Sequence, residues 1–324
     1  MNIAIIGTGV YGIAMATALA QNEKNNIKMW SESDESLNRI EKSRKNFKDL
    51  GGIKLPDKLV FSTSYEEVMR DADLVFIMVA AKYVSSVCEN IKKYITKNMH
   101  FVIGSKGIEQ KTCLFIDEIF QNNIATNKLG VISGPSFAID IAFLEPIGLT
   151  LATKNKNTAK LVHEAYENTN IKLRDTNDIV GIEICGSIKN VIAIAAGVLD
   201  GLGYTESTRS FLITESLHDI KELIDNLGGN KKTILSFAGV GDLLLTATSE
   251  KSRNYTYGML LGKRDMKKAA EYINTTTVEG FYTLNSIYAL LRKKKVKMPV
   301  IDIIYDIVIN NADPNILVDF LMKK

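Results

Sequence analysis

One lysine stands alone in a long apolar stretch of this 324-residue chain. Between Gly181 and Gly201 the sequence reads GIEICGSIKNVIAIAAGVLDG, and Lys189 is the only charged residue from Ile184 to Leu199. A proline-free run rich in Ala, Ile and Val predicts a helix, and a helix that is apolar on nearly every face belongs inside a domain. Burial disfavours an ammonium and lowers its pKa toward the range useful for proton transfer. Lys189 is therefore a candidate general acid or base; the ordinary alternative is a lysine that reaches water from a helix end.

The first residues of the chain form a second candidate site, this one for phosphate. An apolar run at Ile3–Ile6 leads into Gly7, Gly9 and Gly12 at the spacing GxGxxG, and a helical pattern follows. The first glycine permits a tight turn, the second lets a pyrophosphate approach the backbone, and the third allows close packing of helix on strand. The free N–H groups at the start of the helix then face the phosphates. The position between a strand and a helix predicts a nucleotide-binding turn.

An acidic residue, Glu32, follows the second expected strand, twenty residues after Gly12. A carboxylate at this position accepts hydrogen bonds from the adenosine ribose and repels a 2′-phosphate. We therefore expect NAD(H) to be preferred over NADP(H). The alternatives are that Glu32 points into solvent, or that Asp34 or Glu35 takes its place.

Three further segments carry polar groups in expected loops. SKGIE, which contains Lys106, follows a strand at the sheet edge where ligands gather in open α/β sheets. SGPSFA follows the next strand and combines a rigid turn with a helix-cap residue. GVGDL, which contains Asp242, precedes Ser252, Arg253 and Asn254, whose hydroxyl, guanidinium and amide suit a phosphate group. Taken one at a time, each segment is ordinary turn chemistry and each cation an ordinary surface charge.

The expected elements place these segments around one sheet. Short apolar runs alternate with amphipathic ones through the first half of the chain, which favours a parallel sheet with helices on both faces. The expected strands are Asn2–Ile6, Ile27–Trp30, Leu74–Val79, His100–Gly104, Gly130–Ser133 and Gly148–Ala152, and the expected helices between them are Tyr11–Gln21, Asp34–Lys45, Lys82–Tyr94, Leu114–Gln121 and Thr158–Tyr166. After about residue 180 the strand patterns stop and long helical patterns continue.

We therefore predict an α/β chain with two domains, as its length of 324 residues also favours. The first, residues 1–180, is an N-terminal Rossmann-like doubly wound sheet that binds the dinucleotide. The second, residues 181–324, is an all-α C-terminal domain for substrate and catalysis, and it opens with the helix that carries Lys189.

Composition excludes several functional classes. Hydrophobic residues make up 46% and charged residues 24%, with a net charge of +3, as in ordinary globular proteins. The basic run Arg292–Lys297 follows an apolar helical pattern and is typical of a solvated helix end, so we expect no nucleic-acid partner. Three distant cysteines and three isolated histidines predict no metal site. The longest uninterrupted apolar run, Val191–Leu199, is too short to span a bilayer, and no signal peptide is evident. We expect a cytoplasmic protein without membrane insertion.

As an ordered set, these motifs closely resemble the bacterial-type NAD(P)-dependent glycerol-3-phosphate dehydrogenase. The resemblance covers essentially the whole chain, from GTGVYG through SKGIE, SGPSFA and KNVIAIAAGVLDGLGY to GVGDLLLTATSEKSRN and VEG. It implies the reversible NAD(P)H-dependent reduction of dihydroxyacetone phosphate to sn-glycerol 3-phosphate, in supply of phospholipid synthesis, by a homodimer. The specificity lies in the set, since no single motif is diagnostic.

The resemblance also implies roles for individual residues. Lys189 matches the catalytic lysine, Lys106 the lysine near both cofactor and substrate, and Asp242 the acidic residue of the substrate site. The remaining expected substrate residues are Gly134, Ser136, Ser252, Arg253 and Asn254. The expected cofactor residues are Lys106, the residues of the glycine turn, Glu32 and three others: Gly7, Gly9, Val10, Tyr11, Gly12, Glu32, Ala138, Arg253 and Glu279.

The expected mechanism follows from charge. Lys189 donates a proton to the alkoxide that forms as hydride reaches the ketone, and removes it in the reverse direction. Lys106 holds the substrate and reinforces the positive potential at the oxyanion. Asp242 either orients Lys189 or binds a substrate hydroxyl. Arg253 and Asn254 anchor the phosphate and so position the carbonyl. No metal is required.

The chain departs from the family pattern at several places, which bear on affinity and regulation more than on reaction type. The family often carries a basic residue or histidine at the position of Glu32, which sharpens the NADH prediction. The other departures are Asp49 and Gly51 in place of Tyr and Pro, Ser207 in place of Asn, Glu215 in place of Arg, and Tyr255 and Thr256 in place of a basic pair.

Two alternative functions remain open. The first is another dehydrogenase of the same two-domain plan, acting on a different hydroxy acid or an acyl thioester; the SRN run argues against it. The second is a non-catalytic dinucleotide sensor, which the joint presence of Lys106, Lys189 and Asp242 disfavours.

Overall fold

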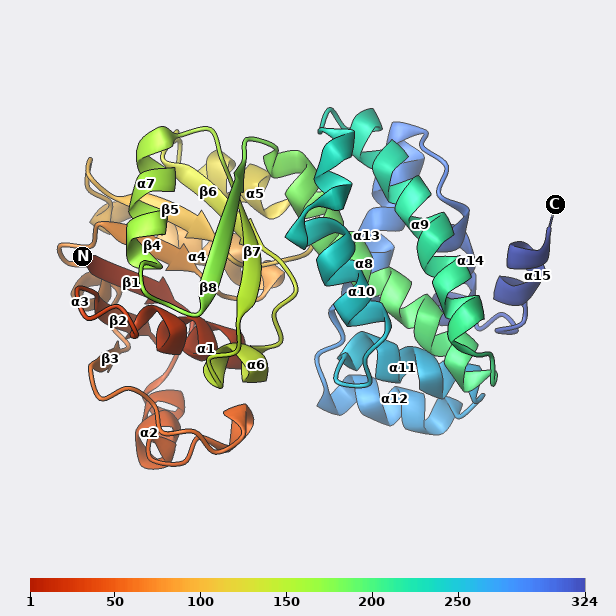
Figure 1. Ribbon diagram of the computed structural model, residues 1–324, viewed down its shortest axis with the longest axis horizontal. Coiled ribbons are helices and arrows are strands. Elements are labelled where there is room, and N and C mark those ends of the chain that lie inside the picture. Colours follow the sequence, from red (N-terminus) through yellow and green to blue (C-terminus); the bar gives the residue numbers. More distant parts are fainter. Residues whose placement is uncertain (324) are drawn as a thin grey trace. The chain divides into compact units, whose positions relative to one another are not determined.

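The computed structural model describes residues 1–323, and the chain divides into two compact units (Figure 1). The first unit comprises Met1–Ser105 and Ile116–Ile179; the second comprises Lys106–Phe115 and the chain from Val180 onward. The segment Lys106–Phe115 thus packs with the second unit, whereas a boundary at residue 180 counts it with the first. This difference matters because the segment carries one of the candidate site residues.

The first unit is built on an eight-stranded sheet in the order β3-β2-β1-β4-β5-β6-β7-β8. The strands are β1 (Asn2–Ile6), β2 (Asn26–Trp30), β3 (Leu59–Ser62), β4 (Leu74–Ile77), β5 (His100–Ile103), β6 (Leu129–Ser133), β7 (Ile147–Thr153) and β8 (Ile171–Thr176). The first six in chain order pair in parallel, and β8 pairs in parallel with β7. Only β7 runs antiparallel to its neighbour β6, so the doubly wound sheet is confirmed but is mixed on one side.

Burial explains which strands the sequence reveals. Every residue of β4, β5 and β6 is buried, as expected for central parallel strands covered on both faces, and these appear as continuous apolar runs. The prediction missed β3 and β8, which form the two edges of the sheet. Both are partly solvated; β3 reads LVFS and β8 reads IKLRDT, so neither gives a long apolar run.

Helices surround this sheet: α1 (Val10–Leu19), α2 (Asp34–Ser43), α3 (Tyr65–Met69), α4 (Val84–Ile91), α5 (Ile116–Asn123), α6 (Ala138–Ala142) and α7 (Lys156–Ala165). Buried side chains of the sheet and of α1 form the main core of this unit. Helix α1 is buried over Gly12–Leu19 because its residues are apolar or small on all sides. Gly12, the third glycine of the motif, lies in the first turn of this helix and is buried.

The second unit is helical: α8 (Ile179–Gly201), α9 (Glu206–Asn226), α10 (Asp242–Ala247), α11 (Arg253–Gly262), α12 (Met266–Thr275), α13 (Glu279–Lys294), α14 (Pro299–Ile309) and α15 (Ile316–Met322). No strand lies between Val180 and Lys323. Apolar side chains from these helices form a single core around α8. The predicted all-α character of this part is confirmed.

Helix α8 is the element from which the second unit is built. Every residue from Gly181 to Leu199 is buried. Within residues 1–323, α8 is the one helix long and apolar enough to cross a membrane by length and composition, with a mean hydropathy of 1.7; 89% of that window is buried inside the structure. This burial is what the core helix of a folded domain shows, and it places Lys189 in the interior.

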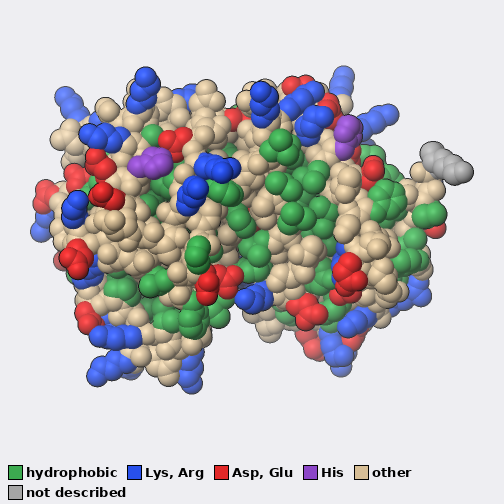
Figure 2. All heavy atoms as spheres, viewed as in Figure 1, with side chains coloured by type: hydrophobic (Ala, Val, Ile, Leu, Met, Phe, Trp, Pro, Cys, Tyr) green, Lys and Arg blue, Asp and Glu red, His purple; other side chains and the backbone are tan. Residues whose placement is uncertain are grey.

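On the face shown in Figure 2, Lys and Arg side chains are interspersed with Asp and Glu.

Candidate active site

Lys189, Lys106 and Asp242 meet inside the second unit. The Asp242 carboxylate lies between the two amines: Oδ1 accepts a hydrogen bond from Lys189 Nζ at 2.5 Å, and Oδ2 accepts one from Lys106 Nζ at 2.9 Å. The side chains of Asp242, Lys189 and Lys106 are 1%, 11% and 19% exposed. Two ammonium groups on one carboxylate leave a net positive charge in a largely buried place, which is suited to stabilising a developing oxyanion.

The local sequence explains how Asp242 reaches this position. It is the first residue of α10, where a carboxylate is favoured by the helix dipole. Before it, the chain makes a sharp bend at Gly239, where any Cβ would lie 2.2 Å from the carbonyl oxygen of Ile234. One turn into α10, the hydroxyl of Thr246 donates to the Asp242 carbonyl at 2.6 Å and accepts from Lys189 Nζ at 3.1 Å. Sequence reasoning missed Thr246, although its position four residues after Asp242 puts both on one helix face.

The electrostatics of the cluster shift both partners. Burial lowers the pKa of Lys189 to about 8; the carboxylate of Asp242 opposes this shift, and the ammonium of Lys106 adds to it. For Asp242, burial acts to raise the pKa, but the Lys106 and Lys189 ammonium groups outweigh it and hold the pKa below its ordinary value. Near neutral pH, Lys189 is thus a protonated amine close to its pKa, which can both release and regain a proton.

Ser252, Arg253 and Asn254 lie at the start of α11 and do three different things. The hydroxyl of Ser252 caps the helix by accepting from the backbone N–H of Tyr255 at 3.3 Å. The Arg253 side chain is exposed and makes no hydrogen bond or ion pair within residues 1–323, so its guanidinium is available to an anion. Asn254 is buried, and both of its polar side-chain atoms have protein partners.

The partners of Asn254 come from two other helices. Its Nδ2 donates to Oδ1 of Asn190 at 3.0 Å, and its Oδ1 accepts from the backbone N–H of Gly280 at 2.7 Å. Asn190 follows Lys189 on α8, and Gly280 follows Glu279, the first residue of α13. The amide expected to contact the phosphate therefore also joins three helices.

In the first unit, the three glycines of the turn have different surroundings. Gly7 has φ +122°, and a Cβ there would lie 2.6 Å from the Met78 carbonyl oxygen; at Gly12 it would lie 2.5 Å from that of Gly7. At Gly9 a Cβ would meet nothing within 4 Å, and no side chain caps the helix N-terminus there. Two positions thus require close packing, while the third leaves open space above uncapped helix N–H groups. These residues fit a dinucleotide pyrophosphate.

A hydrogen bond joins the glycine turn to the SGPSFA loop. The Tyr11 hydroxyl lies 3.2 Å from Ser136 Oγ, which itself donates to the Gly134 carbonyl at 2.9 Å. Gly134 is needed because a Cβ there would lie 2.6 Å from the carbonyl oxygen of Gly148. Ala138 begins α6, which packs against α1, and Val10 at the start of α1 is exposed. The structure therefore gathers these predicted residues at one end of α1.

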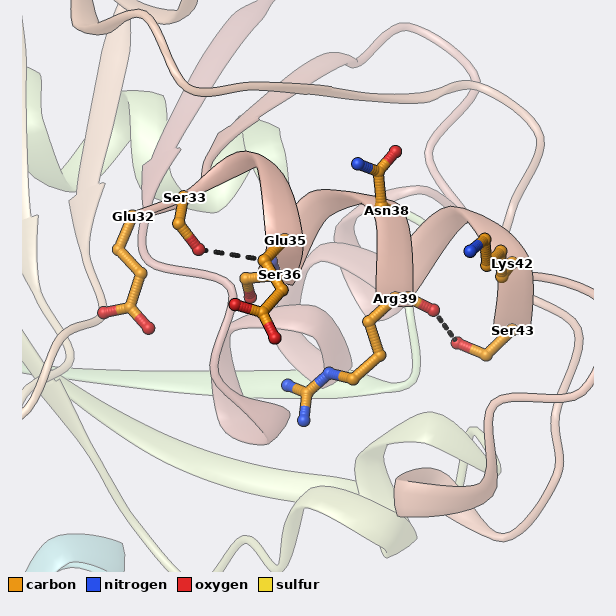
Figure 3. A pocket seen from close by; sticks show the side chains of 8 residues that line it. All are labelled: Glu32, Ser33, Glu35, Ser36, Asn38, Arg39, Lys42 and Ser43. Carbon is orange, nitrogen blue, oxygen red and sulfur yellow. Dashed lines mark hydrogen bonds between the residues drawn. The ribbon is translucent and has the colours of Figure 1, made fainter.

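Glu32 lies between β2 and α2, exposed to solvent. Ser33 caps α2, and the surface beside this turn is an open depression lined by residues from Glu32 to Ser43, along the length of the helix. Figure 3 shows the carboxylates of Glu32 and Glu35 and the guanidinium of Arg39 extending to the same side of α2. Sequence reasoning missed Arg39, because a surface arginine in a polar helix gives no signal by itself.

The departures from the family pattern take structural roles or lie on the surface. Tyr255 is buried, and Thr256 donates from Oγ1 to the Glu250 carbonyl at 3.1 Å. Ser207 and Glu215 are exposed on α9. Asp49 lies in a short turn next to Gly51, which has φ +73° and packs against the ring of Phe143.

Comparison with known proteins shows the family to which the chain belongs. Residues 2–159 match the family model for the N-terminus of NAD-dependent glycerol-3-phosphate dehydrogenase, and residues 178–319 match the model for its C-terminus. The chain belongs to this family. It is therefore an NAD(P)-dependent oxidoreductase of the glycerol-3-phosphate dehydrogenase family, and the expected resemblance is confirmed.

Individual relatives agree with the family assignment. The chain is 35% identical to the glycerol-3-phosphate dehydrogenase [NAD(P)+] of Leptospira biflexa, over 100% of this chain and 98% of the relative. It is also 35% identical to that of Solidesulfovibrio magneticus, again over 100% and 98%. The crystal structure of glycerol-3-phosphate dehydrogenase from Coxiella burnetii matches with a TM-score of 0.92 and 29% identity, over 100% of this chain and 99% of the other.

Proposed function

We propose that this protein catalyses the reversible NAD(P)H-dependent reduction of dihydroxyacetone phosphate to sn-glycerol 3-phosphate, with Lys189 as general acid and base. The observation that carries the proposal is the buried Lys189–Asp242–Lys106 cluster, in which burial lowers the pKa of Lys189 to about 8. Membership of the glycerol-3-phosphate dehydrogenase family supports the choice of substrate.

The residues of the cluster divide the proton chemistry among them. When bound, the dinucleotide supplies the hydride for reduction and accepts it in the reverse direction. Lys189 Nζ donates a proton to the carbonyl oxygen as negative charge develops there, and takes it back from the hydroxyl during oxidation. The ammonium of Lys106 supplies fixed positive potential at the same oxygen. One hydride and one proton convert the ketone to the alcohol, so the step balances without a metal.

Of the two roles open for Asp242, the geometry supports orientation of Lys189. Each carboxylate oxygen already accepts a hydrogen bond from an ammonium, at 2.5 and 2.9 Å, and the side chain is 1% exposed. A substrate hydroxyl would have to displace one of these charge-assisted bonds, which are stronger than a neutral one. We therefore assign Asp242 as a positioning residue that aims Lys189 Nζ.

The phosphate group is bound at the start of α11. Arg253 contributes an exposed guanidinium, and the first N–H groups of this ten-residue helix add partial positive charge. The side chain of Asn254 is held by Asn190 and Gly280, and its Nδ2 uses only one of its two N–H groups in these bonds, so the second N–H can serve the phosphate. Binding energy from the phosphate then positions the carbonyl.

For the cofactor we propose a preference for NADH. Glu32 follows β2 and is exposed, where it can accept hydrogen bonds from the ribose hydroxyls and repel a 2′-phosphate. Arg39 extends to the same side of α2 (Figure 3) and offers a cation to such a phosphate. We therefore expect NADPH to be used as well, but with a lower kcat/KM.

The test is a set of initial rates with dihydroxyacetone phosphate, followed by absorbance with NADH and with NADPH in parallel. Turnover that favours NADH is the expected result. Equal turnover with both cofactors would remove Glu32 as the selector and leave the reaction in place. Tight NADH binding without turnover would overturn the proposal and support a dinucleotide sensor.

Three further proposals rest on the resemblance rather than on the site: a homodimer, a cytoplasmic location, and supply of glycerol 3-phosphate to phospholipid synthesis. Sedimentation equilibrium should give a mass twice that of one chain. Cell fractionation should recover the activity in the soluble fraction. Expression of the chain should restore growth to cells that cannot make glycerol 3-phosphate; failure with active protein present would contradict the proposed supply.

A further inference from the structure

Helices α8 and α11 touch through their backbones. Two glycines on α8, Gly197 and Gly201, face two on α11, Gly258 and Gly262, with the same four-residue spacing. A Cβ at Gly197 would lie 2.0 Å from the carbonyl oxygen of Tyr255, and one at Gly258 would lie 2.0 Å from that of Ile194. At Gly201 and Gly262 the corresponding distances are 2.3 and 2.2 Å. We call these four residues the glycine crossing; no side chain fits between the helices there.

The glycine crossing needs an explanation because glycine disfavours helices. Alanine would be the better helix former at each of the four positions. Two of them, Gly197 and Gly258, lie at least one turn inside their helix, where no cap or turn requires glycine, and Gly201 and Gly262 are the last residues of their helices. Only close approach of the two backbones accounts for the residue type, so what the glycines secure is the separation between α8 and α11.

The same two helices are joined next to the candidate catalytic residues. Asn254 bonds to Asn190 on α8 and to the Gly280 N–H at the start of α13, at 3.0 and 2.7 Å. A Cβ at Gly280 would lie 2.6 Å from the Asn190 carbonyl oxygen, so α13 also approaches α8 closely. Asn190 is the neighbour of Lys189, and Asn254 is the neighbour of Arg253. The proton donor and the phosphate clamp therefore belong to helices that are locked together.

We propose that the glycine crossing and the Asn254 bridge set the distance between the Lys189 amine and the Arg253 guanidinium that binds the phosphate. Gly258 and Asn254 are then positioning residues, and they match this distance to a short phosphorylated ketone. The proposal rests on the proposed function of these two side chains. In such a substrate the phosphate and the carbonyl are separated by a fixed, short chain. If α11 moves away from α8, the phosphate still binds but no longer brings the carbonyl to Lys189 Nζ. The binding energy of the phosphate then no longer helps to align the carbonyl for reaction.

The test compares Gly258→Ala with a control variant that also destabilises the core of the second unit. The added Cβ must push α11 from α8, because the nearest atom is backbone rather than a flexible side chain. We expect kcat/KM for dihydroxyacetone phosphate to fall about 10- to 100-fold, the effect of a misplacement on the order of 1 Å. The inhibition constant of inorganic phosphate should stay unchanged, because the clamp moves as one piece with α11.

The control is Ile304→Ala in α14, which removes a fully buried side chain from the same core without touching the crossing. We expect it to lower the melting temperature and leave both kinetic quantities unchanged. The proposal is overturned if Gly258→Ala changes kcat/KM no more than Ile304→Ala does. It is equally overturned if kcat/KM and phosphate inhibition weaken by the same factor, since the clamp itself would then be damaged.

Two further variants keep the test decisive. If Gly258→Ala does not fold, Gly262→Ala, one turn farther from Asn254, is judged by the same two measurements. Lys189→Ala and Arg253→Ala distinguish a failure of the proposed function from a failure of the proposed positioning role. If neither of them affects turnover of dihydroxyacetone phosphate, the proposed function fails, whatever the glycine variants show.

Discussion

The glycine turn of the first unit and the lysine–aspartate cluster of the second unit both provide positive potential, and they do so in opposite ways. The turn uses backbone N–H groups within Gly7–Gly12, and it stays open because Gly9 has nothing near its missing side chain. The cluster uses side chains that lie 53 and 136 residues apart and are largely buried. The open turn suits binding of a phosphate, whereas the buried cluster can shift a pKa.

This difference shows which of the two sites can take part in proton transfer. A backbone site in solvent presents dipoles that do not titrate, so it binds but transfers no proton. A buried amine beside a carboxylate responds to pH, because burial and neighbouring charges decide its proton affinity. Substitutions in the two places should therefore have different kinetic signatures.

The largest effect is expected from Lys189→Ala, which removes the proton donor. A positioned acid contributes about 10²- to 10⁴-fold, so kcat should fall by that factor in both directions. Lys189→Arg is the matched control: it keeps a cation beside Asp242 but does not release its proton. We expect it to fold with wild-type circular dichroism and to remain nearly inactive. A kcat close to wild type in either variant would contradict the acid–base role.

Arg253→Ala should act on binding. Loss of charge-assisted hydrogen bonds to the phosphate should raise KM for dihydroxyacetone phosphate about 10- to 100-fold. The melting temperature should stay the same, because the side chain is exposed and makes no bond within the described chain. Arg253→Lys should recover part of the loss. Steady-state kinetics against each substrate separates this outcome from a general loss of folded protein.

Gly9→Ala tests the open part of the glycine turn. A methyl group there meets no protein atom within 4 Å, so stability should be unchanged. It should still obstruct the pyrophosphate and weaken NADH binding about tenfold, the cost of one overpacked contact. Gly12→Ala is the contrasting variant, since its Cβ would lie 2.5 Å from the Gly7 carbonyl oxygen and should lower the melting temperature. Fluorescence titration with NADH measures the first effect; unchanged affinity for Gly9→Ala would contradict the assignment.

The pH dependence of kcat/KM should reflect the protonation of Lys189 in the cluster and not the glycine turn. Burial lowers the pKa of Lys189 to about 8. Reduction needs the protonated amine, so its kcat/KM should fall about tenfold per pH unit above that pKa. Oxidation needs the neutral amine, so its kcat/KM should rise with pH and level off above the same point. Profiles without a break near the pKa, or with the same break in Lys189→Arg, would contradict the assignment.

Glu32→Arg should have the smallest effect. Removing the ribose acceptor and adding a cation should change the ratio of kcat/KM for NADH over NADPH about 3- to 10-fold in favour of NADPH. Arg39→Ala is the complementary variant and should shift the ratio the other way. Parallel rates with both cofactors measure it. A ratio that stays at the wild-type value in both variants would place cofactor selection elsewhere.

Much of the fold was predictable because its signals are local. Strands β1, β4 and β5 are apolar runs, and the glycine turn carries its meaning within six residues. The edge strands β3 and β8 were missed because half-solvated strands lack that signal. The sheet was expected to be parallel, but β7 runs antiparallel to β6; no helix was expected between these two strands, and α6, with five residues, is too short for a parallel crossover.

The sequence by itself determined the two-domain plan, the family, and Lys189 as an isolated cation in an apolar helix. Only the tertiary structure decided what surrounds that lysine: Asp242 and Thr246 come from α10, and Lys106 from a segment that packs with the second unit. The tertiary structure also decided that the amide of Asn254 forms hydrogen bonds with Asn190 and Gly280. The physical reason is that helix and turn preferences act over a few residues, whereas burial, pKa and hydrogen-bond partners depend on atoms brought together from distant parts of the chain.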